Sequence, residues 1–221
     1  MPTPKSKQAV SIGEASRREP TQARAQRTID TIFQATAQIV EAEGVAGLNT
    51  NKIALKAGFS VGTLYQYFPT KEAILLALIE RERARQMQRM AALLEHADAV
   101  QQPPKETVRA FIALFVAGFG SGWGPKAKAR QAMIRLGWQL DHNDSVTTAL
   151  RQVSEQVAFH FQKVASAPDG PPLRTTPAAL FVITRAVLGV VRSALMERSP
   201  LLGSDAFIDE LTHMVWRSLE A

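Results

Sequence analysis

The stretch from Asn49 to Phe68 constrains this chain most, because it carries the start, the corner and the end of two short helices. Asn49 is a favourable N-cap, since its side-chain oxygen can accept a hydrogen bond from an unpaired backbone N–H at a helix start. Gly58 suits the left-handed end of a helix because it lacks a Cβ atom. Between them, apolar residues recur at helical spacing on one face: Ile53, Ala54 and Ala57.

A second helix follows at once. Ser60 is its predicted N-cap, and Leu64 and Phe68 lie four residues apart, so both side chains turn inward. Ala54 is small enough to let this helix cross the first one closely. The pattern predicts a helix-turn-helix, whose second helix enters the major groove of DNA.

A purely structural interpretation exists for each part. An alanine and a glycine four residues apart occur by chance in many helical proteins, and tyrosines beside a phenylalanine more often belong to a core or its rim. Tyr65 and Tyr67 cannot both face inward with Leu64 and Phe68, however, so at least one of them points outward, where its hydroxyl can reach a phosphate. The coincidence of two caps, a turn glycine and an outward tyrosine favours the helix-turn-helix.

Residues from Ile29 to about Leu76 resemble the TetR family of bacterial transcriptional regulators. The resemblance rests on five short motifs: IVEAEG at 39–44, TNKIA at 50–54, AG at 57–58, GTLYQYF at 62–68 and KEA at 71–73. It implies a DNA-binding homodimer with an all-helical ligand-sensing region behind the helix-turn-helix. Many members carry a basic residue directly after the position of Ser60. Here that residue is Val61, which removes a charge and opens an apolar contact to a thymine methyl group.

Helical periodicity in the rest of the chain predicts an all-α fold. We expect a flexible basic tail over residues 1–20, a three-helix DNA-binding domain over 21–70, and a helical ligand-sensing and dimerisation domain over 71–221. The first helix should run from about Thr21 or Arg27 to Glu43. Thr70 should cap a long helix that links the two domains. Two apolar helices, one starting at Pro177 and one spanning about 205–219, should pair with their copies as a four-helix bundle.

Positive charge is concentrated at the N-terminus. Residues 1–27 contain six lysines and arginines and two glutamates, a balance of +4, whereas the whole chain carries +6. A basic arm beside a DNA-binding helix adds salt-dependent attraction to phosphates. An ordinary solubilising tail is the alternative, and we expect disorder in the free protein with DNA contact as a second role.

Several classes of function are excluded or disfavoured. The chain has no cysteine, which excludes disulfides, thiolate metal sites and cysteine nucleophiles and agrees with a cytoplasmic protein. No apolar run approaches the roughly 18 residues that span a membrane, and no signal peptide is evident. The four histidines are scattered, and the Asp141–Asp144 segment is interpreted as a turn and cap. We therefore expect no catalytic residues, no metal, no cofactor and no membrane partner.

DNA contacts are expected from the helix-turn-helix and its borders. Gln66 can read adenine if it faces the groove, Thr63 can contact a base or a phosphate, and Tyr67 and Lys71 are expected to hold the DNA backbone. The full predicted set is Arg27, Asn51, Lys52, Thr63, Tyr65, Gln66, Tyr67 and Lys71.

An effector cavity is expected between the C-terminal helices, since pockets between helices are mostly apolar. Its predicted lining, for which core packing is the alternative role of every residue, is Phe111, Phe115, Trp123, Met133, Trp138, Phe159 and Phe181. His160 is interpreted as a satisfied edge histidine, with a polar ligand anchor as the alternative.

These features together predict a homodimeric transcriptional regulator, most often a repressor in this family. A small hydrophobic or aromatic effector would release it from a palindromic operator. The alternative is a DNA-binding scaffold of the same fold that has no small-molecule ligand and acts through a protein partner. An enzyme is disfavoured because no nucleophile and base share a motif.

Overall fold

A computed structural model describes residues 12–120, 131–137, 144–168 and 170–220. These residues are almost entirely helical, which confirms the all-α prediction. The elements are α1 (Ile12–Glu43), η1 (Val45–Gly47), α2 (Thr50–Ala57), α3 (Val61–Tyr67), α4 (Lys71–Ala99), α5 (Pro104–Ala117), α7 (Asp144–Ala165), α8 (Pro177–Met196) and α9 (Asp205–Leu219). Residues 131–137 are also helical, and one isolated bridge joins Leu173 to Glu220.

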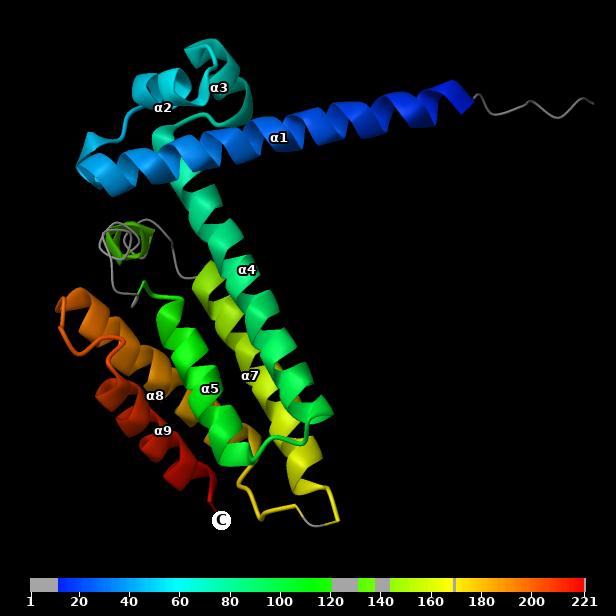
Figure 1. Cartoon of the computed structure of the whole chain (residues 1–221), viewed down its shortest axis with the longest axis vertical. Helices are drawn as coiled ribbons and strands as arrows, with labels where there is room; N and C mark the ends of the chain where they lie inside the picture. The colour runs from blue at the N-terminus through cyan, green and yellow to red at the C-terminus, as the bar shows by residue number, and fades with distance from the viewer. Residues whose placement is uncertain (1–11, 121–130, 138–143, 169, 221) are drawn as a thin grey trace, which may run out of the picture.

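The helices form two groups that α4 connects (Figure 1). At one end, α2 and α3 lie against α1, which crosses the start of α4 and projects far beyond it. Along the rest of α4, α5 and α7 pack against it, and α8 and α9 complete a bundle. The helix-turn-helix therefore sits at one end of the molecule and the C-terminal bundle at the other.

The predicted capping residues Asn49, Ser60 and Thr70 begin their helices, and Thr176 caps the helix that was predicted to start at Pro177. The side chains of Asn49, Ser60, Thr70 and Thr176 accept hydrogen bonds from backbone N–H groups three residues later, at 2.8 to 3.3 Å. Each bond pairs one of the donors that a helix start leaves unsatisfied. The predicted beginnings of α2, α3, α4 and α8 are thus confirmed.

The first helix differs from its predicted start. It begins at Ile12 rather than at Thr21 or Arg27, so residues 12–20 of the expected tail are helical. Alanine, glutamate, arginine and glutamine, all favourable helix formers, fill much of residues 14–26. The expected tail ended at Pro20, a residue that disfavours a helix interior, but the helix continues through it.

Two hydrophobic cores are separate from each other. The N-terminal core joins α1, α2 and α3 to the first two turns of α4, through fully buried residues that include Ile32, Ile53, Leu64 and Ile74. The C-terminal core joins α4, α5, α7, α8 and α9 around Met90, Val116 and Leu195. Because α4 contributes to both cores, a shift of this helix changes the packing in both groups of helices.

Helix α8 is unusually apolar. Among the described residues it is the one helix long and apolar enough, by length and composition, to cross a membrane, with a mean hydropathy of 1.8. Arg185 and Arg192 divide its sequence, so α8 contains no uninterrupted apolar run of the length that spans a membrane. Leu180, Ile183, Val191 and Leu195 bury one face of α8 in the C-terminal core, as in a core helix of a globular bundle.

Candidate nucleic-acid interface and ligand cavity

The corner of the helix-turn-helix has the predicted geometry. Gly58 adopts a left-handed conformation with φ 75° and ψ 26°. The backbone N–H of Phe59 then donates to the carbonyl of Ala54 at 2.9 Å, which closes the end of α2. Two residues later, Ser60 accepts from the Thr63 backbone N–H at 3.0 Å and its hydroxyl lies 2.9 Å from the Thr63 hydroxyl.

The inner face of the two helices is locked by packing. Leu64 and Ile53 are fully buried and Ala54 is 1% exposed, so the small alanine gives α3 room to cross α2. The Phe68 ring packs against Phe33 of α1, with 5.7 Å between the ring centroids. This core fixes the outer face of α3 relative to α1.

The predicted DNA-contact residues lie outside this core. Tyr65 is 52% exposed, whereas Tyr67 is partly buried and packs against the N-terminal core. Tyr65 is therefore the outward tyrosine of the pair. Thr63 is also partly buried, and the remaining members are exposed: Arg27, Asn51, Lys52, Gln66 and Lys71.

The two lysines of the set have partners within the protein. Lys52 forms an ion pair with Glu43, and both side chains are nearly half exposed. The Lys71 ammonium group donates to the Leu48 carbonyl at 3.3 Å and lies 4.0 Å from Glu72. Exposed ion pairs of this kind contribute little to stability, so either lysine can exchange its partner for a phosphate at small cost.

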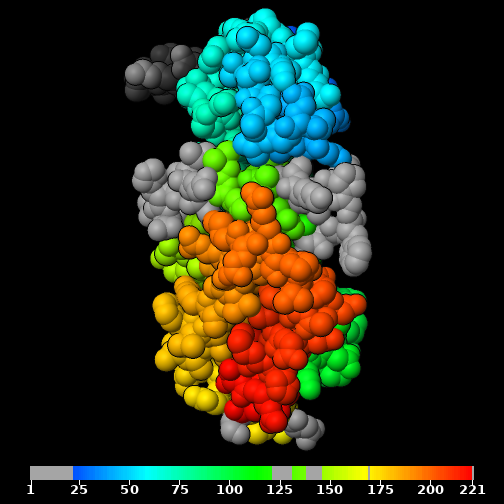
Figure 2. All heavy atoms as spheres, turned by 90° about the vertical axis from the view of Figure 1, so that its left-hand side faces the viewer, coloured from blue at the N-terminus to red at the C-terminus, as the bar shows by residue number. Residues whose placement is uncertain are grey.

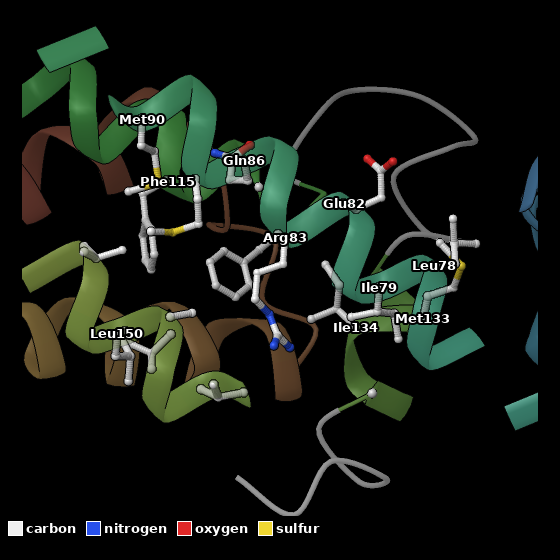
Figure 3. A pocket seen from close by; sticks show the side chains of 18 residues that line it. Leu78, Ile79, Glu82, Arg83, Gln86, Met90, Phe115, Met133, Ile134 and Leu150 are labelled. Atoms are coloured by element: carbon white, nitrogen blue, oxygen red, sulfur yellow. The ribbon is translucent and has the colours of Figure 1, made fainter. Parts of the chain in front are cut away.

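A cavity of about 140 Å³ lies inside the C-terminal bundle (Figure 3). Most of its lining is apolar and comes from α4, α5, α7 and residues 133–137, as with Met90, Phe115 and Leu150. Three polar side chains of α4 also line it: Glu82, Arg83 and Gln86. A second cavity of about 60 Å³, nearer α8 and α9, shares Phe115, Leu150 and Val153 with the first.

Only some of the predicted cavity residues line a cavity in the structure. Phe115 and Met133 line the larger cavity, and Phe111 and Phe115 line the smaller one. Phe159 and Phe181 line neither, and they are 73% and 57% exposed on the outer surface. Their assignment is wrong, because helical periodicity does not say which side of a helix a neighbour covers. Trp123 and Trp138 lie outside the described residues.

Sequence reasoning missed the polar part of the cavity. A run of charged residues such as 80–85 is typical of a solvated helix face. Glu82, Arg83 and Gln86 nevertheless line the same cavity as Ile79 and Met90. The signal was present in the spacing, because residues 79, 83, 86 and 90 repeat at i, i+4, i+7 and i+11 and so share one helix face.

Contacts between α1 and α4 lie beside the N-terminal core. Arg81 forms an ion pair with Asp30 of α1, and its guanidinium carbon lies 5.4 Å from the centre of the Phe33 ring. A hydrogen bond from Gln26, together with Arg81, lowers the pKa of Asp30, so this carboxylate stays charged. Arg81 is two residues from Arg83, which places the interhelical contact one helix turn or less from the cavity wall.

His160 is buried, not an edge residue. Its side chain is 4% exposed, and its Nδ1 atom lies 2.9 Å from the Asp98 carboxylate, which Lys163 also contacts at 2.7 Å. Burial lowers the pKa of His160, and the nearby Asp98 partly opposes this effect. No group of three metal-ligating side chains occurs within the described ranges.

The helix-turn-helix region matches a known protein family. Residues 32–78 match the model of bacterial regulatory proteins of the tetR family. The chain is 35% identical over 89 residues to the transcriptional regulator EthR of Mycolicibacterium smegmatis, which covers 39% of each protein. It is 35% identical over 54 residues to the transcriptional repressor DrrR1 of Streptomyces coeruleorubidus, which covers 24% of this chain and 20% of the relative.

The likeness extends over the whole fold when structures are compared. SmeT, the repressor of the Stenotrophomonas maltophilia multidrug efflux pump SmeDEF, superposes with a TM-score of 0.61 over 86% of this chain and 89% of its own, at 20% identity. At that identity the superposition establishes the shared fold.

Proposed function

We propose that this chain, whose residues 32–78 match the model of bacterial regulatory proteins of the tetR family, is a homodimeric repressor that binds operator DNA and responds to a small apolar effector. The observation that carries the proposal is the outer face of α3, where exposed Tyr65 and Gln66 stand on a helix anchored by fully buried Leu64. A rigid helix with an exposed polar face is what the major groove accommodates.

DNA recognition is divided between α3 and its borders. In this proposal Gln66 reads a base edge: it is exposed on α3, and its amide can pair with adenine N6 and N7. Lys52, Lys71 and Arg27 stand on three different helices and supply charge for the phosphates, which position the protein without reading sequence. Tyr65 also contacts a phosphate, through its hydroxyl group.

Dimerisation uses α8 and α9. The outer face of α8 exposes large apolar side chains, with Phe181 and Val182 at 57% and 64% exposure, and a Cβ atom added at Gly189 would meet nothing within 4 Å. Figure 2 shows α8 and α9 side by side on one face of the molecule, below the helix-turn-helix. A second copy covering this face would bury apolar surface that the single chain leaves in water.

The effector acts through α4. A ligand in the larger cavity touches Glu82, Arg83 and Gln86 of α4. Arg81 on the same helix contacts Asp30 and Phe33 of α1. A ligand that prefers one position of α4 therefore changes the spacing of the two helix-turn-helix units in a dimer. A coupling of about 1–3 kcal/mol changes DNA affinity by about 5–150-fold.

A ligand-independent scaffold is the second candidate. It predicts operator binding that no small molecule alters, and a bundle without a cavity. The cavity of about 140 Å³ beside the helix that enters both cores favours the effector-controlled regulator.

Footprinting of purified protein on its own upstream DNA, at two salt concentrations, tests the proposal. Two protected half-sites centred about one helical turn apart, near 34 Å, are expected. Affinity should fall steeply with salt because phosphate contacts release counterions. Equal binding to a random duplex at both salt concentrations would contradict the proposal.

A further inference from the structure

The charges in the wall of the larger cavity are balanced within α4. Its described lining includes one carboxylate, that of Glu82, and one guanidinium, that of Arg83. Glu82 binds Arg85 at 2.8 Å, and Arg83 donates to Glu80 at 2.9 Å. A charged ligand would upset this balance and bring an uncompensated charge into a mostly apolar space, which costs free energy.

The uncharged polar groups of both cavities also have partners. The side-chain amide of Gln86 donates to a backbone carbonyl of α5, and the Thr184 hydroxyl in the smaller cavity donates to a backbone carbonyl of α8 at 2.8 Å. In the part of the chain that the structure describes, the side-chain atoms that are buried without a hydrogen bond belong to Gln156 and His160. Neither residue lines either cavity, so the described walls hold no buried polar atom that a ligand must satisfy.

The larger cavity offers sulfur and aromatic contacts. Met87, Met90 and Met133 line it (Figure 3), and thioether sulfur makes favourable contacts with aromatic rings. Phe115 and Phe119 line it as well, with their rings edge-on and 5.1 Å between the centroids, an arrangement that a third ring can extend. A cavity of about 150 Å³ holds benzene, so the volume of about 140 Å³ suits one aromatic ring.

The smaller cavity adjoins the larger one. Phe115, Leu150 and Val153 line both cavities and so form the partition between them. The volume of about 60 Å³ beyond this partition has room for about two or three carbons at the volume per carbon of bound benzene. A ring in the larger cavity can therefore carry a short chain past these three side chains.

We propose that the effector is an uncharged alkyl-substituted aromatic molecule, whose ring fills the larger cavity among the methionines and whose chain of about two or three carbons enters the smaller cavity. This inference rests on the proposed function, because it names the ligand class of the same regulator. It assigns discrimination against charge to the paired groups of α4 and discrimination of chain length to the smaller cavity.

Calorimetric titration of the full-length protein with propylbenzene, phenylacetate and 2-phenylethylamine tests the discrimination against charge. The three molecules have nearly equal size. Propylbenzene should bind at least about tenfold more tightly than either ion, because each ion loses its hydration without finding an unpaired charge in the wall. Equal or tighter binding of either ion would overturn the proposal, as would the lack of saturable propylbenzene binding up to its solubility limit.

Comparison of toluene with propylbenzene tests the role of the smaller cavity. The wild-type protein should bind propylbenzene about tenfold more tightly, since two more methylene groups leave water. Val187 lines the smaller cavity and not the larger one, so Val187→Phe should remove this difference and retain toluene binding. Equal affinity of the wild-type protein for the two molecules would contradict this role whatever the variant does, and so would an undiminished difference in folded Val187→Phe.

Val100→Phe is the matched control. Val100 is exposed and lines neither cavity, so this variant should bind both molecules as the wild type does. Thermal unfolding of each variant shows whether it is folded.

Methyl resonances of protein labelled with ¹³C-methyl methionine locate the ring. The ring current of bound propylbenzene should shift the signals of Met87, Met90 and Met133, and it should leave Met196, which lines neither cavity, unchanged. Unshifted signals from all three cavity methionines would overturn the proposal. Operator binding by the same sample without ligand tests the regulator itself, so failure of this inference and failure of the proposed function are distinguishable.

Discussion

Gly58 sets the corner between α2 and α3 at the scale of one residue. Its φ of 75° is unfavourable for residues with a Cβ atom, although a Cβ added there would meet nothing within 4 Å. Gly58→Ala should therefore lower the free energy of unfolding by about 1 kcal/mol through backbone strain alone. For a chain of this size the melting temperature should fall by about 2–4 °C.

Gly62→Ala is the control for that change. Gly62 lies inside α3, where an added Cβ would be 3.7 Å from the Ser60 hydroxyl, an ordinary contact. Alanine is favoured over glycine in a helix by up to about 1 kcal/mol, so this variant should be as stable as the wild type or more so. Equal melting temperatures for the two variants would contradict the role of Gly58.

His160 makes the stability of the bundle depend on pH. Because burial lowers its pKa below 6.5 in the folded chain, the unfolded chain binds more protons between the folded value and 6.5. Stability therefore rises with pH across that window, and it is lost as pH falls from 6.5 toward the folded value. His160→Gln should flatten this dependence in denaturant titrations between about pH 5 and 7.5.

His213→Gln provides the comparison, since His213 is exposed on α9. It should leave the pH dependence as in the wild type. A pH dependence in His160→Gln that matches the wild type would show that other groups cause it.

At the scale of single residues, the spacing of residue types in the sequence predicted the helix caps and the turn glycine. It placed Asn49, Ser60 and Gly58, because caps and left-handed ends depend on a few neighbouring atoms. It could not decide between Tyr65 and Tyr67, since that choice depends on how α3 is rotated against α1. The burial of His160 likewise depends on Asp98, which is 62 residues away in the chain.

At the scale of elements, α4 links the helix-turn-helix to the cavity. Arg81→Gln removes both the ion pair with Asp30 and the stacking of the guanidinium over Phe33. Amide hydrogen exchange should accelerate several-fold where α1 crosses α4, while protection around Val116 and Leu195 in the C-terminal core stays unchanged. The coupling between effector and operator should weaken in the same variant.

Arg85→Gln removes an exposed pair with Glu82 one turn further along α4. It should leave exchange at the crossing unaltered. If both variants accelerate exchange equally, Arg81 has no special role in the contact.

Element boundaries were predictable where a cap or a proline marks them, as at Thr70 and Pro177. The start of α1 was not, because Pro20 disfavours a helix while the favourable helix formers around it promote one, and the sequence does not say which effect prevails. The cavity face of α4 was also missed. A charged segment such as 80–85 looks solvated until the position of α5 and α7 shows which of its charges are covered.

At the scale of the whole molecule, the two copies of the proposed dimer meet through the outer face of α8. Val182 is 64% exposed there. Val182→Glu would place an unpaired carboxylate against the second copy, which costs several kcal/mol and should raise the dimer dissociation constant by about a hundredfold or more. Light scattering after size-exclusion chromatography should then report a monomer.

Val100→Glu is matched in chemistry and exposure, because Val100 is 54% exposed at the end of α4, away from α8. It should remain dimeric. A dimer that survives Val182→Glu would place the contact between copies on another face. The sequence indicated α8 and α9 through their apolarity, but it could not show which of their side chains the chain itself buries.

The most direct test of the account is operator binding by Gln66→Ala beside Lys105→Ala. Gln66 is exposed on α3, and Lys105 is exposed at the start of α5 in the C-terminal bundle. Quantitative footprinting should show that Gln66→Ala loses about 1–3 kcal/mol of binding free energy and relaxes specificity at one base pair in each half-site, while Lys105→Ala binds as the wild type does. Equal operator affinity for both variants and the wild type, with unchanged sequence preference, would contradict the claim that α3 reads the DNA.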